Sequence, residues 1–203
     1  YSSAASDVYK RQRHPHALLW GNGTTASSDG QFFRASDRAA GRGDINLHYG
    51  SEPGTKFYSH LSDQYGYFSI LPISPTESEA AYVLDGLFDH DTILDIEEHF
   101  TDTGGASDHV FALFALIGKR FAPRLRNLKD RKFHTFEKAD TYPALADHIG
   151  VRINTALIME YWDDLLRLAA SIRTRTVAPS TILKKLAASP NPCLLYTSDA
   201  ADE

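Results

Sequence analysis

The chain has 203 residues, of which 42% are hydrophobic and 23% charged, and its formal net charge is −5 at pH 7. This length and composition suit one globular domain with its own core. No apolar run approaches the ~18 residues of a membrane-spanning helix, and a single cysteine, Cys193, excludes a disulfide within the chain.

The two ends of the chain look like translated sequencing-library adapter. Residues 2–12 read SSAASDVYKRQ and residues 193–203 read CLLYTSDAADE, and one DNA sequence read from opposite strands can encode both. We therefore predict that 1–12 and 193–203 are not native and that 13–192 is a partial domain without an initiator methionine. That native part has a net charge of −3 and no cysteine, as is common in cytoplasmic proteins.

Strand and turn signals fill the first third of the native part. The apolar runs 16–20 and 31–33 flank a stretch rich in Gly, Thr and Ser, and together they indicate a first strand region. Residues 45–49, 56–62 and 67–73 are β-branched and aromatic, and the turn sequences YGSEPG and SDQYG separate them. This pattern predicts an antiparallel meander in which Asp63 is a turn residue.

A helix is predicted to follow the meander. The sequence SPTESE at 74–79 offers Thr76 as the cap and Glu79, three residues later, as its capping-box partner. Helical spacing continues through five apolar residues: Ala80, Val83, Leu84, Leu87 and Phe88.

Strands and helices alternate in the second half. The sequence ILDIEEHFTD at 93–102 indicates a strand that Thr103 and two glycines end, and Ser107 or Asp108 can cap a second helix that ends at Gly118. A short strand RFAPRL follows at 120–125, and the remaining helical stretches are predicted at 143–149, 154–173 and 179–188.

Three antiparallel strands followed by helix, strand, helix and strand is the order of the ribonuclease H-like fold. We therefore predict an α/β protein with a mixed central sheet and flanking helices, incomplete on its C-terminal side. In that fold the first and fourth strands are neighbours, so Asp29 and Asp102, which close these strands, are expected to lie together. Gly30 and the Thr103–Gly105 turn leave room for a nucleic acid backbone.

Two such carboxylates suit a metal centre. Without a cation they would repel each other, whereas Mg²⁺ prefers hard oxygen ligands of this kind. Two ions can together activate an attacking oxygen and stabilise a leaving one at phosphorus. The alternative is that Asp29 and Asp102 are ordinary turn residues in Gly-rich loops.

The charges are unevenly distributed along the chain. Ten acidic residues and no Lys or Arg lie between Glu77 and Asp108, and eight basic residues lie between Lys119 and Lys138. This arrangement suits a cation site beside a track for a polyanion, although two solvated faces of opposite sign would give the same pattern. If the strand at 120–125 runs parallel to the strand before it, five basic residues lie beside the metal site: Arg124, Arg126, Lys129, Arg131 and Lys132.

Six collinear motifs carry a resemblance to a known family. They are WGNGTTASSDGQFF, GSEPGTKFYSHLSDQY, ESEAAYVLDGL, IEEHFTDTGGASDHVFAL, RFAPRLRNL and LLRLAASIRTRTVAPSTILKKLAA. Over residues 16–189 the sequence resembles the DDE catalytic domain of the Tn-three family of replicative transposases, which nicks transposon ends and joins them to target DNA.

The resemblance implies a function and its residues. Asp29 in SSDGQ and Asp102 in TDTGG match the first two catalytic carboxylates, Mg²⁺ is the implied cofactor with Mn²⁺ as a substitute, and the complete site holds two ions. The implied partners are transposon-end and target DNA, and the full-length protein is implied to be a homo-oligomer in the bacterial cytoplasm. Asn22 stands where the family motif WGDGTT has an acidic residue.

The family's catalytic Glu lies further downstream than this chain extends, so the fragment is expected to carry two-thirds of the site and to be inactive alone. The local substitutes are Glu160, Asp163 and Asp164, on a helix where acids usually face solvent. The alternative function is a non-catalytic DNA-binding or assembly module.

The histidines offer weaker candidates. His109 follows the TDTGG turn closely enough to act as an accessory contact to a phosphate or water. A zinc set of His99, Asp102 and His109 is not expected, because His99 and Asp102 would face opposite sides of one strand. A Ser-His-Asp set using Ser28 lacks a nucleophile-elbow pattern.

Overall fold

The structure, a computed structural model, describes residues 10–35, 43–90 and 92–188. Residues 1–9 and 193–203 of the predicted adapter segments lie outside these ranges. The strands are β1 (Thr25–Arg34), β2 (Gly54–Ser62), β3 (Tyr67–Ile73), β4 (Glu98–Thr101) and β5 (Arg120–Phe121). The helices are α2 (Ala17–Trp20), α3 (Asp85–Phe88), α4 (Asp108–Leu116), α5 (Thr155–Glu160), α6 (Trp162–Arg173) and α7 (Pro179–Ala188). Short 3-10 turns lie at Glu79–Tyr82, Leu128–Asp130, Ala139–Thr141 and Pro143–His148.

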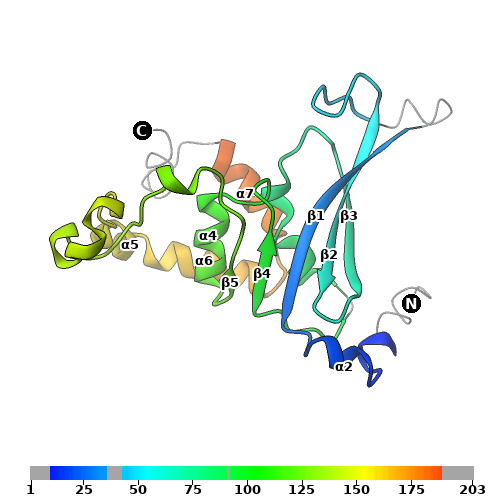
Figure 1. Ribbon diagram of the computed structural model, residues 1–203, viewed down its shortest axis with the longest axis horizontal. Coiled ribbons are helices and arrows are strands. Elements are labelled where there is room, and N and C mark those ends of the chain that lie inside the picture. Colours follow the sequence, from blue (N-terminus) through cyan, green and yellow to red (C-terminus); the bar gives the residue numbers. More distant parts are fainter. Residues whose placement is uncertain (1–9, 36–42, 91, 189–203) are drawn as a thin grey trace.

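The five strands form one mixed sheet in the order β3-β2-β1-β4-β5 (Figure 1). β1 pairs antiparallel with β2, which pairs antiparallel with β3, so the predicted meander is confirmed for 56–62 and 67–73, while β1 takes the place of the strand predicted at 45–49. On its other side β1 pairs parallel with β4, and β4 pairs parallel with β5. The predicted α/β class, with a mixed sheet and flanking helices, is therefore confirmed.

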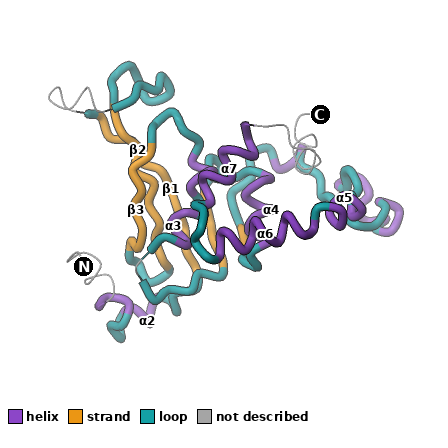
Figure 2. The backbone as a smooth tube through the Cα atoms, turned by 180° about the vertical axis from the view of Figure 1, so that it is seen from behind, coloured by secondary structure: helices purple, strands orange, loops and turns teal. Residues whose placement is uncertain are grey.

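α3, α4, α6 and α7 pack on one face of the sheet (Figure 2). Val83, Leu84, Val110, Phe114 and Ile172 from the helical layer are at most 1% exposed and join strand residues in one apolar core. Ser107 caps α4 as predicted, because its side chain accepts a hydrogen bond from the Val110 amide. Among the helices that the structure describes, none is long and apolar enough to cross a membrane.

The other face of the long strands carries exposed aromatic side chains. Side chains alternate across a strand, and in β1 the buried Ala26 and Ser28 alternate with exposed residues. On the exposed side Phe33 of β1 packs edge-on against Phe57 of β2, with 5.5 Å between ring centroids, and the two are 49% and 38% exposed.

Three predicted elements differ from the structure. Residues 45–49 are not a strand: the Asn46 side chain accepts from the His48 amide and bends the chain into a turn. The predicted helix after the meander is split into a 3-10 turn at Glu79–Tyr82 and the single turn α3, because Ser74 and Thr76 bond to each other instead of capping it. The helix predicted at 154–173 breaks at Tyr161.

The strands also have different bounds from those predicted. β1 runs through the Gly- and Ser-rich stretch, so Asp29 lies inside this strand and not at its end. β4 and β5 are shorter than predicted, and Asp102 comes directly after the last residue of β4.

A buried polar contact joins the three central strands. Ser28 of β1 lies 2.7 Å, through its Oγ, from both the Tyr58 hydroxyl of β2 and His99 Nε2 of β4. All three side chains are buried, and burial raises the pKa of Tyr58, so its hydroxyl stays protonated. This contact fixes β1, β2 and β4 relative to one another immediately before Asp29.

A second buried histidine lies beside this contact. His60 of β2 donates through Nε2 to the Val83 carbonyl, 3.1 Å away, and its ring lies 5.6 Å from that of His99 between centroids. Burial lowers the pKa of His60 to about 4 and that of His99 to about 3, and the neighbouring His60 further lowers the pKa of His99. Both are therefore neutral in the folded protein.

We predict that Ser28→Ala lowers the free energy of unfolding by about 1–3 kcal/mol, because it leaves two buried polar groups without this partner. Ser27→Ala is the matched control, since Ser27 is the exposed neighbour on the same strand, and a surface change of this kind stays within about 0.5 kcal/mol. Urea unfolding of both variants measures the difference. Equal effects would contradict a role for the buried contact.

We also predict acid sensitivity from the two buried histidines. Unfolded histidine binds a proton near pH 6.5, whereas these two do so only near 4 and 3, so stability is complete above pH 6.5 and falls below it. The slope approaches about 2.7 kcal/mol per pH unit for two protons. Urea unfolding between pH 5 and 7 measures it.

The control for this prediction is His48→Gln, because His48 is exposed. His99→Gln should reduce the slope and His48→Gln should leave it unchanged. A free energy of unfolding that stays constant between pH 5 and 7 would contradict the burial of neutral histidines.

Candidate functional site

Asp29 lies where β1 extends beyond its parallel neighbour. The pairing of β1 with β4 ends at Ser28 and Thr101, while β1 continues along β2. Asp29 and Asp102, each one residue past that last pair, are therefore adjacent across the end of β4. The prediction that these two residues lie together is confirmed, although only Asp102 follows a strand end.

In each aspartate, one carboxylate oxygen accepts hydrogen bonds from the backbone amides of glycines that follow it in the chain. Asp29 Oδ1 accepts from the Gly30 amide at 2.8 Å. Asp102 Oδ1 accepts from the amides of Gly104 and Gly105, at 2.9 and 3.3 Å, which closes the turn after β4. These bonds fix the direction of both carboxylates, and within the described chain the second oxygen of each accepts no hydrogen bond.

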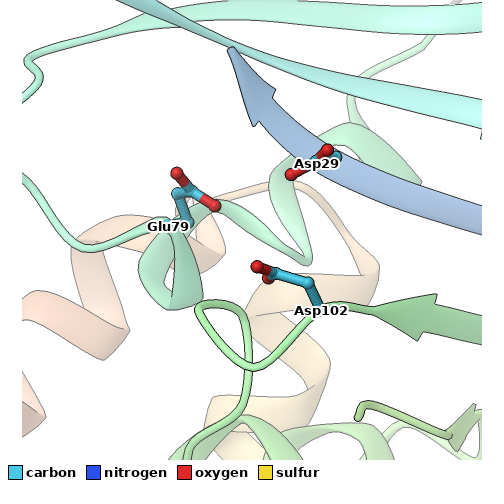
Figure 3. Close-up of side chains that lie close together, drawn as sticks. All are labelled: Asp29, Glu79 and Asp102. Carbon is cyan, nitrogen blue, oxygen red and sulfur yellow. The ribbon is translucent and has the colours of Figure 1, made fainter. Parts of the chain in front are cut away.

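Glu79 is a third carboxylate at this place. One oxygen from each of Asp29, Glu79 and Asp102 lies within 4.8 Å of the other two, and Figure 3 shows the three side chains turned toward a common space. Both aspartates are exposed and Glu79 is half-buried. Among the described residues this is the one group of three or more acidic, His or Cys side chains so placed.

The sequence did not predict this position for Glu79. The capping-box role expected for it is wrong, because its 3-10 turn has Ser78 at the N-cap with no side-chain bond. The Glu79 carboxylate instead pairs with Lys56, whose Nζ lies 3.1 Å from Oε1. The available signal was Lys56 itself: in the alternation of β2 it falls on the buried face, where a lysine requires an acidic partner.

The donor set fits a divalent cation. Two like charges 4 Å apart repel by about 4 kcal/mol at an effective dielectric of 20, so three carboxylates this close favour any cation that enters. Carboxylate oxygens are the ligands that Mg²⁺ and Mn²⁺ take. Asp29, Glu79 and Asp102 are thus the residues that could hold a metal ion.

Other predicted candidates lie apart from the three carboxylates. Among the described residues, His99 and His109 do not join Asp102 in a group with metal-ligand spacing, and His99 is fully buried. The proposed substitutes for the third acid are also outside it: Glu160, Asp163 and Asp164 are exposed on α5 and α6, and Asp164 pairs with Arg167.

Two loop residues have structural roles. Asn22 accepts from both the amide and the hydroxyl of Thr24 and so caps the turn before β1. Asp63 is the predicted turn residue, and its carboxylate accepts from the Gly23 amide at 3.0 Å.

The basic segment begins beside Asp102. Because β5 is parallel to β4, as expected, the chain leaves it at the same edge of the sheet, and the Arg124 amide donates to the Thr101 carbonyl at 2.9 Å. Arg126, Lys129, Arg131 and Lys132 follow on an exposed loop with a single 3-10 turn.

Comparisons of the sequence with known proteins point to one family. The family model described as "Tn3 transposase DDE domain" matches residues 1–201. The transposase for transposon Tn501 of Pseudomonas aeruginosa is 48% identical over 94% of this chain, and that for Tn21 of Escherichia coli is 47% identical over the same share. The transposase for transposon gamma-delta of Escherichia coli strain K12 is 32% identical over 85%.

The chain spans about a fifth of the length of these relatives, since the match covers 19% of the first two and 17% of the third. The resemblance carried by the six sequence motifs is confirmed. The chain therefore belongs to the family of Tn3 transposase DDE domains.

Proposed function

We propose that this chain is part of a transposase catalytic domain that cleaves DNA strands and joins them to target DNA with the help of divalent metal. The observation that carries the proposal is the pair of aspartates, Asp29 and Asp102, held by their own backbone amides at the edge where two parallel strands meet. The relatives named above are transposases, which supports DNA as the substrate.

The proposed fold is ribonuclease H-like. Supporting it are a first strand with an antiparallel meander on one side and parallel strands on the other. In this arrangement the central strands β1 and β4 present their catalytic carboxylates together.

The proposed cofactor is Mg²⁺, with Mn²⁺ as a substitute, and two ions in the complete site. When bound, these ions would supply Lewis acidity at the phosphorus centre and stabilise the charge on the attacking and leaving oxygens. Asp29 and Asp102 would hold the positive charge of these ions between their two carboxylates. Gly104, which is exposed beside Asp102 and has no side chain, leaves the approach to this carboxylate open to a nucleic acid backbone.

The basic segment after β5 is the proposed DNA track. Arg124, Arg126, Lys129, Arg131 and Lys132 continue from the sheet edge that carries the aspartates. Ammonium and guanidinium groups bind the phosphate backbone whatever its sequence, so this segment would orient a strand across the carboxylates. We propose His109, in the first turn of α4, as an accessory contact at the same edge.

The rest of the site is proposed to lie beyond this chain. In the family the catalytic Glu comes from a downstream segment, and the full-length protein is proposed to act as a homo-oligomer in the bacterial cytoplasm. Residues 13–192 would then be a partial catalytic domain that positions DNA and metal but does not complete the reaction.

We predict that the chain alone does not nick supercoiled DNA with Mg²⁺ or Mn²⁺, and that a longer protein including the downstream segment does. In the longer protein, Asp29→Ala or Asp102→Ala should abolish nicking, because each removes a carboxylate that holds the catalytic charge. Gel analysis of plasmid relaxation measures both results. Nicking by the short chain that Asp29→Ala removes would instead show that an acid within it, Glu79 first, completes the site.

We also predict that replacing Arg126, Lys129 and Arg131 by Ala weakens duplex binding equally for all sequences. Each lost phosphate contact lowers the slope of log affinity against log salt by roughly 0.9, so the three together lower it by up to about 3. Fluorescence anisotropy at several salt concentrations measures the slope. The control replaces the exposed Arg167, Arg173 and Lys185 of α6 and α7, which should change it little. An unchanged slope in the folded first variant would make the segment a solvated face.

A further inference from the structure

Lys56 is a lysine buried beneath the carboxylates. It lies on the inner face of β2, where its side chain is 5% exposed. Its ammonium contacts Glu79 Oε1 at 3.1 Å and the Glu77 carbonyl at 3.2 Å, and it lies 5.7 Å from the centre of the Tyr49 ring. A charge this deep needs a partner, so loss of the Glu79 carboxylate alone would leave the Lys56 ammonium buried and uncompensated.

Glu79 has one oxygen left after this pairing. A Cβ placed on Gly104 would lie 3.2 Å from Asp102 Oδ1 and 3.5 Å from Glu79 Oε2, so this second oxygen faces the turn that holds Asp102. Figure 3 shows the same arrangement, with Glu79 reaching toward the two aspartates from the opposite side. Lys56 therefore holds the carboxylate by one oxygen and leaves the other directed at the site.

Gly30 makes this approach possible. A Cβ at this position would overlap the Glu79 carboxylate, so any larger residue would displace it. Gly30 is also the residue whose amide holds Asp29. One glycine thus serves two of the three carboxylates.

The summed charge of the three carboxylates and Lys56 balances the charge of one divalent cation. Asp29, Glu79 and Asp102 together carry −3, and the buried ammonium of Lys56 adds +1. The net charge of −2 matches a single Mg²⁺ or Mn²⁺.

We infer that Glu79 is a further ligand of the cation bound by Asp29 and Asp102, and that Lys56 is the residue that positions it. The inference rests on the proposed metal-dependent function. Residues of this chain then provide one complete three-carboxylate cation site, and Lys56 acts on it only through Glu79.

The test is titration of the 203-residue chain with Mn²⁺, with free Mn²⁺ measured by its electron paramagnetic resonance signal. We expect one strong site in the unchanged chain. Lys56→Met should weaken it by about 10–100-fold, the loss typical when a ligand's orienting partner is removed, and Glu79→Gln, which removes the charge of the ligand itself, should weaken it at least as much. Lys56→Arg, which keeps the charge and the hydrogen bond, should restore affinity close to that of the unchanged chain.

The double variant separates positioning from a general structural effect. If Lys56 acts through Glu79, adding Lys56→Met to Glu79→Gln causes no further loss. Lys119→Met is the matched control, because Lys119 is a largely buried lysine paired with Asp95, outside the carboxylate group. It should leave Mn²⁺ affinity unchanged.

Circular dichroism identifies variants that fail to fold. Should Lys56→Met fail, Gly30→Ala displaces the Glu79 carboxylate without altering the lysine and should weaken Mn²⁺ binding in the same range. Unchanged affinity in folded Glu79→Gln, or additive losses in the double variant, would overturn the inference. Asp29→Asn separates failure of this inference from failure of the proposed metal site. If Asp29→Asn and Glu79→Gln both leave Mn²⁺ binding unchanged, the metal site itself is wrong. If Asp29→Asn abolishes binding while Glu79→Gln and Lys56→Met do not change it, only the roles of Glu79 and Lys56 are wrong.

Discussion

The parallel pairing of β4 with β1 is the constraint on which the rest of the molecule depends. It joins segments about seventy residues apart in the chain, and its last pair, Ser28 with Thr101, determines where both aspartates lie. β5 continues the same direction, so the basic segment leaves the sheet at the edge that carries the carboxylates. A shift in this one pairing would separate acidic and basic groups that lie far apart in sequence.

Two polar clusters beneath the carboxylates hold that geometry. One is neutral and joins Ser28, Tyr58 and His99 across three strands, and the other is the ion pair of Lys56 with Glu79. Buried polar contacts of either kind add little net stability compared with well-packed apolar side chains. What they provide here is a fixed position for the atoms next to the site, because each cluster has few alternative ways to satisfy its buried groups.

Sequence patterns predicted the parts of this site that depend on local chain signals. Asp29 and Asp102 were found because each lies beside glycines at the edge of an apolar run, and Ser107 was found because its cap is formed within one turn. Glu79 was missed because its role depends on Lys56 from another strand, which no local pattern connects to it. The strand predicted at 45–49 was wrong for a related reason: the side-chain bond of Asn46 outweighed the β-branched and aromatic residues around it.

The two-residue alternation of β1 makes the site vulnerable to one kind of genetic damage. Ser28 and Asp29 lie on opposite sides of this strand, one buried and one exposed. Deletion or insertion of a single residue between Thr25 and Ser28 would exchange the two faces, placing a carboxylate in the core and a hydroxyl at the surface. Substitutions among the exposed residues of the same strand would leave both faces in place. One lost codon in this stretch can therefore remove the site even when the codon for Asp29 is kept.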